Sequence, residues 1–433
     1  MSISLRVTLV LLALSLLGLA VSGQVIYARL VYLWVFLIGS SFILARMGLD
    51  AIELRRYSRV ERSEIGQVFE EIFEVHNHSR LPRLWLEIRD LTDLPGTRGS
   101  RVLTLIGGRR SRSFVSRTRL ISRGMFALGP TELRSGDLFG LFSTKRTLPS
   151  GKFLIVYPRL IELFGVPNPP GLLPGGEAVR RRTHQVTPNA ATVREYATGD
   201  PISRMHWPSV ARRSCLIVKE FELDPLAEVW IFVDAQKTAH AKLEYTLESD
   251  AGSVIFQKGG LTKLIPSTEE YAATLAASLA QHYLRSGRTV GYAAASSELT
   301  ILAAERGGRQ LNKIIESTAL FHADGQTPFT AFALRQARHL PRGSTLYLIS
   351  PSIEATIAVL GEQLQRLGHR ALIVLLNAAS FAGKPGGEAL ASKLNSKGTP
   401  TVLIREGQLL AGALTGLRLA QEMPRIWIKP GIV

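Results

Sequence analysis

The densest group of side chains that could do chemistry lies between residues 194 and 213. Within it, Asp200 and His206 supply a carboxylate and an imidazole, and Arg204 supplies a guanidinium. These three groups could form a hydrolase site only if they converged in an open pocket. Gly199 permits a tight turn, and Asp200 followed by Pro201 is typical of the start of a helical turn. We therefore expect a polar turn at this point in the chain.

Other side chains in the same segment suggest two further interpretations. Arginines, carboxylates and aromatic rings occur close together: Arg194, Arg204, Arg212, Glu195, Asp200, Tyr196 and Trp207. Forked arginine–carboxylate pairs with rings stacked on the guanidinium planes would make a buried clamp that holds a linker onto a domain. The same groups left exposed would make a docking surface or an anion site. The sequence does not decide among these three interpretations: a buried clamp, an exposed docking or anion site, and a hydrolase site.

Familiar catalytic and metal-binding motifs do not occur in the sequence. It contains no Walker A loop, no G-x-G-x-x-G, no H-E-x-x-H and no G-x-S-x-G. Its single cysteine, Cys215, excludes an intramolecular disulfide and a cysteine-rich zinc module. His76 and His78 share a strand face but lack acidic or cysteine companions, so we predict no metal there.

The pattern after Asp224 predicts an α/β domain over residues 225–433. Apolar strands are expected at 229–234, 289–292, 345–350, 371–376 and 401–404, with helices at 268–286, 309–320, 329–339 and 354–367. Continuous apolar strands that alternate with amphipathic helices indicate an open, mostly parallel, Rossmann-like sheet covered on both faces.

The preceding segments differ in pattern. Residues 60–165 alternate apolar and polar side chains in short runs broken by glycine and proline, which predicts a small antiparallel β-sandwich. Residues 166–224 combine a Pro/Gly-rich linker with the polar segment described above.

Two apolar runs at the start of the chain predict a transmembrane helical hairpin over residues 1–46. Ile3–Val21 and Val25–Ala45 each approach the ~20 residues needed to cross a bilayer, and they account for the mean hydropathy of +0.13. Five arginines follow the second run: Arg46, Arg55, Arg56, Arg59 and Arg62. By the positive-inside rule we expect both termini and the soluble domains to be cytoplasmic.

The chain is basic, with 52 Lys+Arg against 35 Asp+Glu and a net charge of +17. Eight arginines with no lysine or acidic residue between them lie from Arg98 to Arg123. A solvated face or contact with anionic lipid headgroups would explain this run. We expect no nucleic-acid binding, because Phe114 and Phe126 alone make a poor stacking platform and no DNA- or RNA-binding motif is present.

The motif R-E-Y-x-x-G-D-x-x-x-R-x-x-W-x-x-x-A-R, which starts at Arg194 and is followed by L-x-V-K-E-F-E, resembles the hallmark of the bacterial "domain of unknown function 58" family. The D-x-F-G-L-F element at Asp137 and the V-Y-P at Val156 fit the same family, whereas Pro208 replaces its usual lysine. The resemblance implies that Arg194, Tyr196, Gly199, Asp200, Arg204, Trp207 and Arg212 form the hallmark site. It also implies a C-terminal domain similar to von Willebrand factor A.

A von Willebrand factor A domain often holds Mg²⁺ through a D-x-S-x-S motif, a loop threonine and a late aspartate, because hard cations prefer several oxygen ligands. Here Gln236 replaces the first serine after Asp234, and Lys237 lies beside the site. Thr238 and Thr327 could still serve as oxygen ligands, but Ser350-Pro351-Ser352 takes the place of the late aspartate. We expect a degenerate site without Mg²⁺ and no other cofactor.

The family's genes usually lie beside a MoxR-class AAA ATPase, often with other von Willebrand factor A proteins and transglutaminase-like membrane proteins. The resemblance therefore implies a non-enzymatic adaptor in the bacterial inner membrane that works with such an ATPase in assembly, maturation or envelope stress. The alternatives are a hydrolase-like enzyme that uses the hallmark segment and a structural protein that binds a lipid surface.

Overall fold

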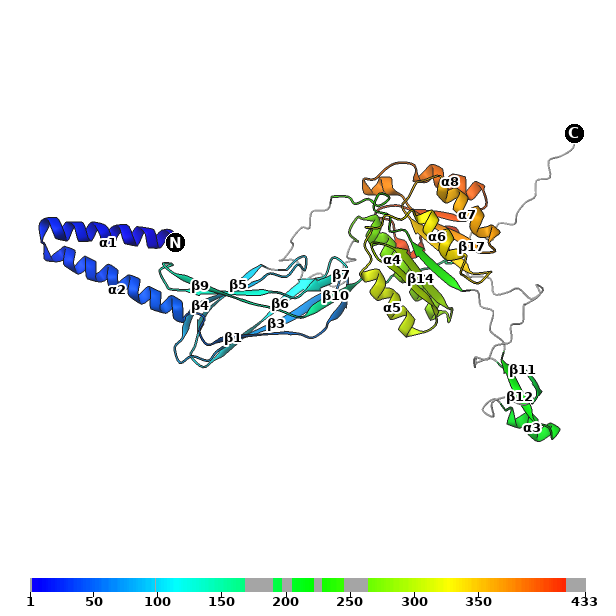
Figure 1. The fold of residues 1–433 in the computed structure, drawn as a ribbon, viewed down its shortest axis with the longest axis horizontal. Coiled ribbons are helices and arrows are strands. Elements are labelled where there is room, and N and C mark those ends of the chain that lie inside the picture. The colour runs from blue at the N-terminus through cyan, green and yellow to red at the C-terminus, as the bar shows by residue number, and fades with distance from the viewer. Residues whose placement is uncertain are drawn as a thin grey trace. The chain divides into compact units, whose positions relative to one another are not determined.

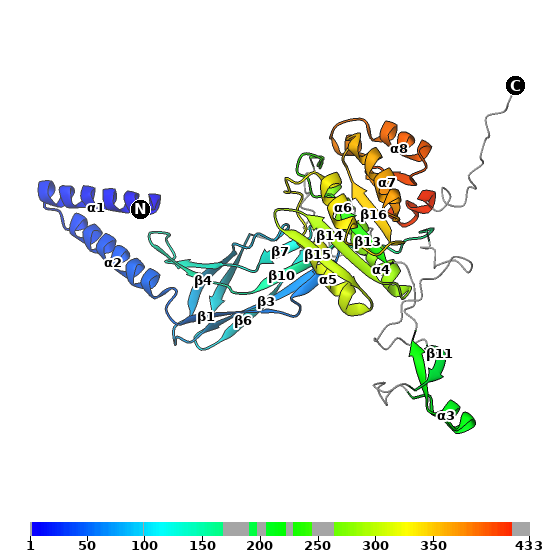
Figure 2. The same cartoon turned by 45° about the vertical axis from the view of Figure 1, so that its right-hand side comes forward.

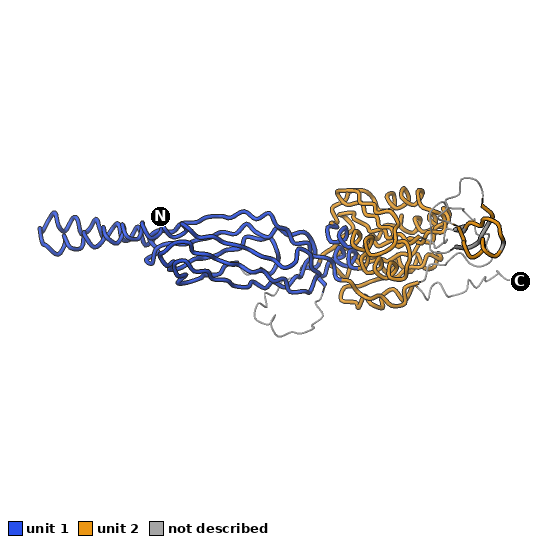
Figure 3. The backbone as a smooth tube through the Cα atoms, turned by 90° about the horizontal axis from the view of Figure 1, so that it is seen from below, with its two compact units in different colours: residues 1–159, 243–274, 315–321 blue, residues 160–242, 275–314, 322–433 orange. Residues whose placement is uncertain are grey.

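The computed structural model describes residues 2–97, 99–167, 190–196, 205–221, 228–244 and 264–417. The chain forms two compact units, coloured separately in Figure 3. Unit 1 comprises residues 1–159, 243–274 and 315–321, and unit 2 comprises residues 160–242, 275–314 and 322–433.

Unit 1 begins with two apolar helices, α1 (Ile3–Ser22) and α2 (Val25–Met47), which contact each other and diverge from the connector between them (Figure 1). Ser2 caps α1 by accepting a hydrogen bond from the Leu5 N–H, and Gly23 ends that helix in a left-handed conformation. Only 11% of the most apolar window of each helix is buried. Both helices are long and apolar enough to cross a membrane, as the sequence predicts.

The strands of unit 1 form three sheets. The first sheet has the order β1 (Ile52–Ser58), β3 (Val68–Asn77), β6 (Ser111–Arg119). The second has the order β5 (Ser100–Ile106), β4 (Arg83–Asp90), β8 (Thr131–Gly136), β9 (Ser143–Leu148). The third has the order β2 (Arg62–Glu64), β10 (Phe153–Tyr157), β7 (Gly124–Ala127). All pairs are antiparallel except β10 with β2. The first strand begins at Ile52, ahead of residue 60, where the sequence pattern first becomes clear.

The alternation along each strand explains the core. In β3 every second side chain from Phe69 to Asn77 is buried. Phe73 and Val75 of that strand share a hydrophobic cluster with Leu86 of β4 and Leu133 of β8. Two antiparallel sheets therefore face each other across one core, as expected from the sequence.

The strand register places several connections at the same end of these sheets. Ile52, just after α2, lies opposite Asn77, and Arg83 at the start of β4 lies opposite Ile106. Gly136 lies opposite Ser143 across the β8–β9 turn, at the same end of β4. The β3–β4, β5–β6 and β8–β9 connections thus all lie at the end where α2 enters.

Unit 2 contains a six-stranded sheet in the order β15-β14-β13-β16-β17-β18. The strands are β13 (Val229–Val233), β14 (Val290–Ala295), β15 (Leu299–Glu305), β16 (Thr345–Ser350), β17 (Arg370–Leu376) and β18 (Thr401–Ile404). All neighbours are parallel except β14 with β15, which is an antiparallel edge (Figure 2). The predicted open, mostly parallel sheet is confirmed. The sequence pattern did not predict β15.

Helices cover both faces of this sheet. They are α4 (Thr268–Arg285), α5 (Gly308–Ala319), α6 (Phe329–Ala337), α7 (Thr356–Arg366) and α8 (Gly387–Ser396). Phe332 of α6, Leu360 of α7 and Leu394 of α8 belong to one hydrophobic cluster with Phe232 and Leu348 of the sheet.

On the opposite face, the Tyr283 hydroxyl in the second half of α4 lies 2.6 Å from the Tyr347 hydroxyl of β16. Both tyrosines are fully buried, and burial raises the pKa of each above its ordinary value.

Candidate functional site

The strand order creates a crevice at the carboxyl ends of β13 and β16. The chain leaves β13 toward β14 on one side and leaves β16 toward β17 on the other, which makes this pair a topological switch point. Asp234 directly follows β13, and Ser350 is the last residue of β16. In open α/β sheets this is the position where binding sites form.

Asp234 is fully buried at this switch point. Its Oδ2 accepts a hydrogen bond from the Ser350 hydroxyl at 2.6 Å, and its Oδ1 accepts one from the Gln236 N–H at 2.9 Å. The His240 Nε2 lies 2.8 Å from the Asp234 carbonyl oxygen, to which it can donate. Burial raises the pKa of the Asp234 carboxyl, although the charge of His240 and the Ser350 hydrogen bond oppose this shift.

The two loops that the sequence assigned to this site are joined by their backbones. Gly325 donates its N–H to the Ala235 carbonyl, and its own carbonyl accepts from the Lys237 N–H, both at 2.9 Å. A Cβ at Gly325 would lie 2.2 Å from the Ala295 carbonyl oxygen, so only glycine fits this close approach. The structure thus brings the Asp234 loop to the loop that carries Thr327.

The hydroxyls of these loops are not gathered around Asp234. Thr238 accepts a hydrogen bond from the Gln236 side-chain amide at 3.0 Å, and Thr327 is exposed. Within the described part of the chain, no cluster of three or more His, Cys, Asp or Glu side chains could hold a metal ion. The sequence placed Ser350 at the position of the late aspartate, but it did not predict that the Ser350 hydroxyl would fix the Asp234 carboxylate, because a serine at a strand end carries no distinguishing signal.

The hallmark segment forms a small hairpin. Strands β11 (Ala190–Glu195) and β12 (Ile217–Phe221) pair antiparallel, and the short helix α3 (Trp207–Arg213) lies between them. The His206 Nδ1 lies 2.6 Å from the Ser209 hydroxyl at the start of α3, and Ser214 ends this helix in a left-handed conformation.

The described hallmark side chains are exposed on this hairpin. Trp207 is 61% exposed and Tyr196 is 36% exposed, and Arg212 is also exposed. Gly199, Asp200, Arg204 and the Arg194 side chain lie outside the described residues, so an arginine–carboxylate clamp between Arg204 and Asp200 stays a prediction.

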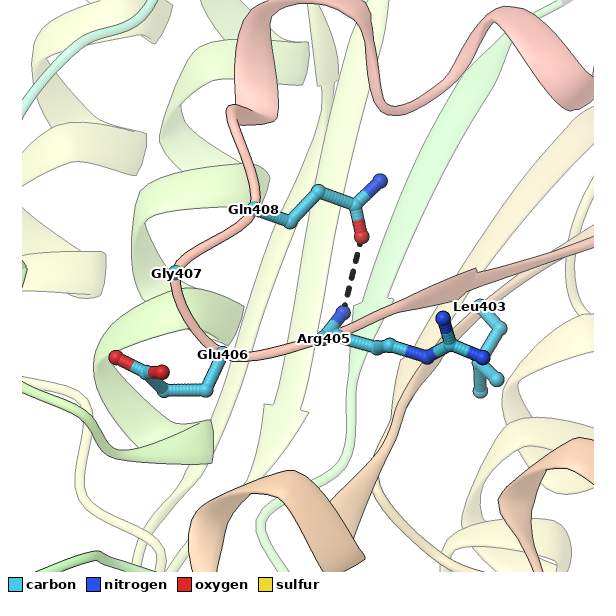
Figure 4. Close-up of a pocket in the computed structure, with 5 residues that line it drawn as sticks. All are labelled: Leu403, Arg405, Glu406, Gly407 and Gln408. Carbon is cyan, nitrogen blue, oxygen red and sulfur yellow. Dashed lines mark hydrogen bonds between the residues drawn. The ribbon is translucent and has the colours of Figure 1, made fainter.

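A shallow pocket lies beyond β18, where the chain turns through Glu406 and Gly407 (Figure 4). The Gln408 Oε1 accepts a hydrogen bond from the Arg405 N–H at 3.0 Å. Arg405 also forms an ion pair with Glu388 at 2.7 Å, and both side chains are more than 60% exposed. An exposed ion pair of this kind contributes about 0–1 kcal/mol, and these residues form a surface turn.

The arginine run predicted as a solvated face is divided in the structure. Five of its side chains are exposed: Arg101, Arg109, Arg110, Arg112 and Arg117. Arg119 is half-buried, and Arg123 is buried and forms ion pairs with Glu269 and Glu270 at the start of α4. The prediction of one solvated face is therefore wrong for Arg123, since tertiary contacts in unit 1 cover it.

A protein-family model described as "Protein of unknown function DUF58" matches residues 192–251, which include most of the hallmark hairpin. The "Uncharacterized protein YeaD" of Bacillus subtilis (strain 168) is 23% identical over 228 residues. The segment that carries the hallmark motif therefore belongs to the DUF58 family. The YeaD match covers 52% of this chain and half of YeaD's own length.

Two solved structures resemble this chain only weakly. The CARDB domain of the PF1109 protein from Pyrococcus furiosus is 9% identical, with a TM-score of 0.17, and covers 24% of this chain and 91% of that domain. A complex of zinc 2-glycoprotein with prolactin inducible protein from human seminal plasma is 7% identical, with a TM-score of 0.18, and covers 24% of this chain and 92% of that chain. Neither likeness carries an argument about fold or function.

Proposed function

We propose that this DUF58 protein is a non-enzymatic protein-interaction adaptor anchored in the bacterial inner membrane, with its soluble domains in the cytoplasm and a MoxR-class AAA ATPase as its partner. The exposure of Trp207 on the hallmark hairpin carries this proposal. An exposed tryptophan, with an exposed tyrosine and arginine nearby, has the composition of an interaction hot spot.

The C-terminal domain supports the same proposal. Its strand order, with an antiparallel edge strand, suits a von Willebrand factor A-like domain that binds protein. The carboxylate at its switch point is fully buried and already hydrogen-bonded to Ser350 and Gln236. That arrangement favours a structural Asp234 over a reactive one.

The anchor is supported by α1 and α2, whose length and apolar surface suit a bilayer. Arg46 in the last turn of α2 and the arginines of β1 that follow it favour a cytoplasmic position for the soluble domains.

The test is capture of a purified MoxR-class ATPase by the detergent-solubilised full chain. We expect Trp207→Ala combined with Arg212→Ala to reduce capture at least tenfold, because hot-spot truncations cost about 2 kcal/mol or more. Leu409→Ala is the matched control, since Leu409 is 78% exposed on the same unit but lies outside the hallmark hairpin. Equal capture by both variants and the wild type would reject the hairpin as the docking surface.

A further inference from the structure

The β8–β9 loop (Asp137–Phe142) holds two large apolar side chains in solvent. Leu138 is 63% exposed and Phe139 is 56% exposed. An ordered loop that displays adjacent apolar side chains is a typical interaction site.

The loop is held in this shape by a buried carboxylate. Asp137 is 2% exposed, and it accepts backbone hydrogen bonds from Phe139 at 2.9 Å, Leu141 at 3.2 Å and Phe142 at 2.7 Å. Gly140 adopts a φ of +68°, which other residues rarely do. The exposure of Leu138 and Phe139 is therefore imposed by the loop's own hydrogen bonds.

The same loop contacts the ends of both apolar helices. The Ser2 hydroxyl at the start of α1 donates to the Leu141 carbonyl at 2.8 Å. The Phe142 ring packs edge-on against Phe42 of α2, with centroids 5.5 Å apart. Thr144, at the start of β9, donates its hydroxyl to the Ala45 carbonyl of α2 at 2.9 Å.

These contacts fix the depth of the loop relative to α2. Phe42 precedes the helix end at Met47 by five residues (47 − 42), which at about 1.5 Å per residue is roughly 7 Å. Interfacial apolar groups lie about 5–10 Å into the boundary between headgroups and acyl chains. The loop thus reaches the depth of that boundary if α2 spans the bilayer.

The neighbouring connections at this end of the sheets carry positive charge. Arg109 donates its backbone N–H to the Ser79 carbonyl at 2.8 Å, so the β5–β6 and β3–β4 turns are joined. Arg80, Arg109 and Arg110 are exposed on these turns, and none of the three forms an ion pair with a described residue. Basic side chains beside an apolar loop are the composition expected of a surface that meets anionic lipid headgroups.

We propose that the β8–β9 loop inserts Leu138 and Phe139 into the interface of the same bilayer that α1 and α2 span, with the arginines of the neighbouring turns over the lipid headgroups. This inference rests on the membrane anchor proposed above. The loop is a third membrane contact, which would hold the strands of unit 1 at a fixed orientation to the membrane.

The test places an environment-sensitive fluorophore at single cysteines in the full chain, in a Cys215→Ser background. The protein is reconstituted into phosphatidylethanolamine–phosphatidylglycerol vesicles, with or without lipid that carries a nitroxide near its headgroup. Labels are placed by Phe139→Cys in the loop, Phe153→Cys as the matched control and Leu14→Cys within α1. Phe153 is 51% exposed at the start of β10, and Leu14 is 57% exposed.

We expect the label at residue 139 to emit at shorter wavelength than the label at residue 153, and to be quenched several-fold more by the nitroxide lipid. The label at residue 14 should be shielded from aqueous iodide if α1 lies in the bilayer. A shielded residue 14 with residues 139 and 153 quenched alike would overturn the loop proposal and leave the anchor intact. Exposure of residue 14 to iodide would overturn the anchor itself, and the loop proposal with it.

Discussion

Arg123 donates a guanidinium N–H to the Glu269 carboxylate at 2.8 Å, and only 2% of the arginine side chain is exposed. The same guanidinium donates to the Thr318 carbonyl at 3.0 Å and to the Phe321 carbonyl at 2.7 Å. One arginine between β6 and β7 therefore binds the start of α4, the last turn of α5 and the segment just after α5, all within unit 1.

Removal of this guanidinium should destabilise the protein strongly. Arg123→Ala leaves the buried Glu270 carboxylate and two backbone carbonyls without their donor, and breaking a buried pair costs about 3–5 kcal/mol. We expect a large drop in Tm, measured by differential scanning fluorimetry of the full chain in detergent.

Arg117→Ala provides the matched control for Arg123. Arg117 belongs to the same arginine run and pairs with Glu70 at 2.8 Å, but its side chain is 60% exposed. Exposed pairs contribute about 0–1 kcal/mol. Equal Tm values for the two variants would contradict a structural role for Arg123.

Asp234 predicts a specific dependence of stability on pH. Burial raises the pKa of the Asp234 carboxyl in the folded protein above its value in the unfolded chain. The protonated carboxyl therefore contributes to stability fully at pH values below the ordinary carboxyl range, and this contribution is lost as pH rises through the raised pKa. The Asp234→Asn side chain does not ionise, so its stability does not fall in this way. Its amide can still form hydrogen bonds with Ser350 and the Gln236 N–H. We expect the Tm of Asp234→Asn to rise relative to that of the wild type as pH increases from about 4 toward 7. If the Tm of the wild type instead rises relative to that of the variant over that range, the pKa of Asp234 is lowered in the folded protein.

The degenerate switch-point site should not bind Mg²⁺ or Mn²⁺. Gln236 replaces a serine ligand, Ser350 takes the place of the late aspartate and the Asp234 carboxylate is buried. Titration calorimetry of the full chain in detergent should show no saturable binding in the millimolar range. One-site binding that Asp234→Ala abolishes would mean that the remaining oxygen ligands are sufficient.

The orientation of the anchor can be tested at the C-terminus. A reporter that is active only outside the cytoplasmic membrane, fused after Val433, should give no signal, because the arginines that follow α2 favour the cytoplasmic side. A fusion of the same reporter into the connector at Gly23, between α1 and α2, is the positive control. Signal from the C-terminal fusion would reverse the orientation and remove the support for a cytoplasmic ATPase partner.

Local pattern was sufficient for much of this fold. The apolar runs at 345–350 and 371–376 predict buried parallel strands because a strand covered on both faces must be apolar at every position, and both are buried throughout or nearly so. The two N-terminal helices follow from run length alone. The hallmark motif identified the family because its residue types and spacing are specific.

Only the tertiary structure separated residues that are alike in sequence. Arg117 and Arg123 belong to one run, yet one is solvated and the other is buried, because burial depends on segments more than a hundred residues away. Ser350 became part of the Asp234 site through the pairing of β13 with β16. The exposed Leu138 and Phe139 lie beside the apolar helices because the register of β4, β8 and β9 brings their loop to the end of the sheets where α2 enters. Each of these relationships depends on contacts between segments that are far apart in the sequence, which no local pattern encodes.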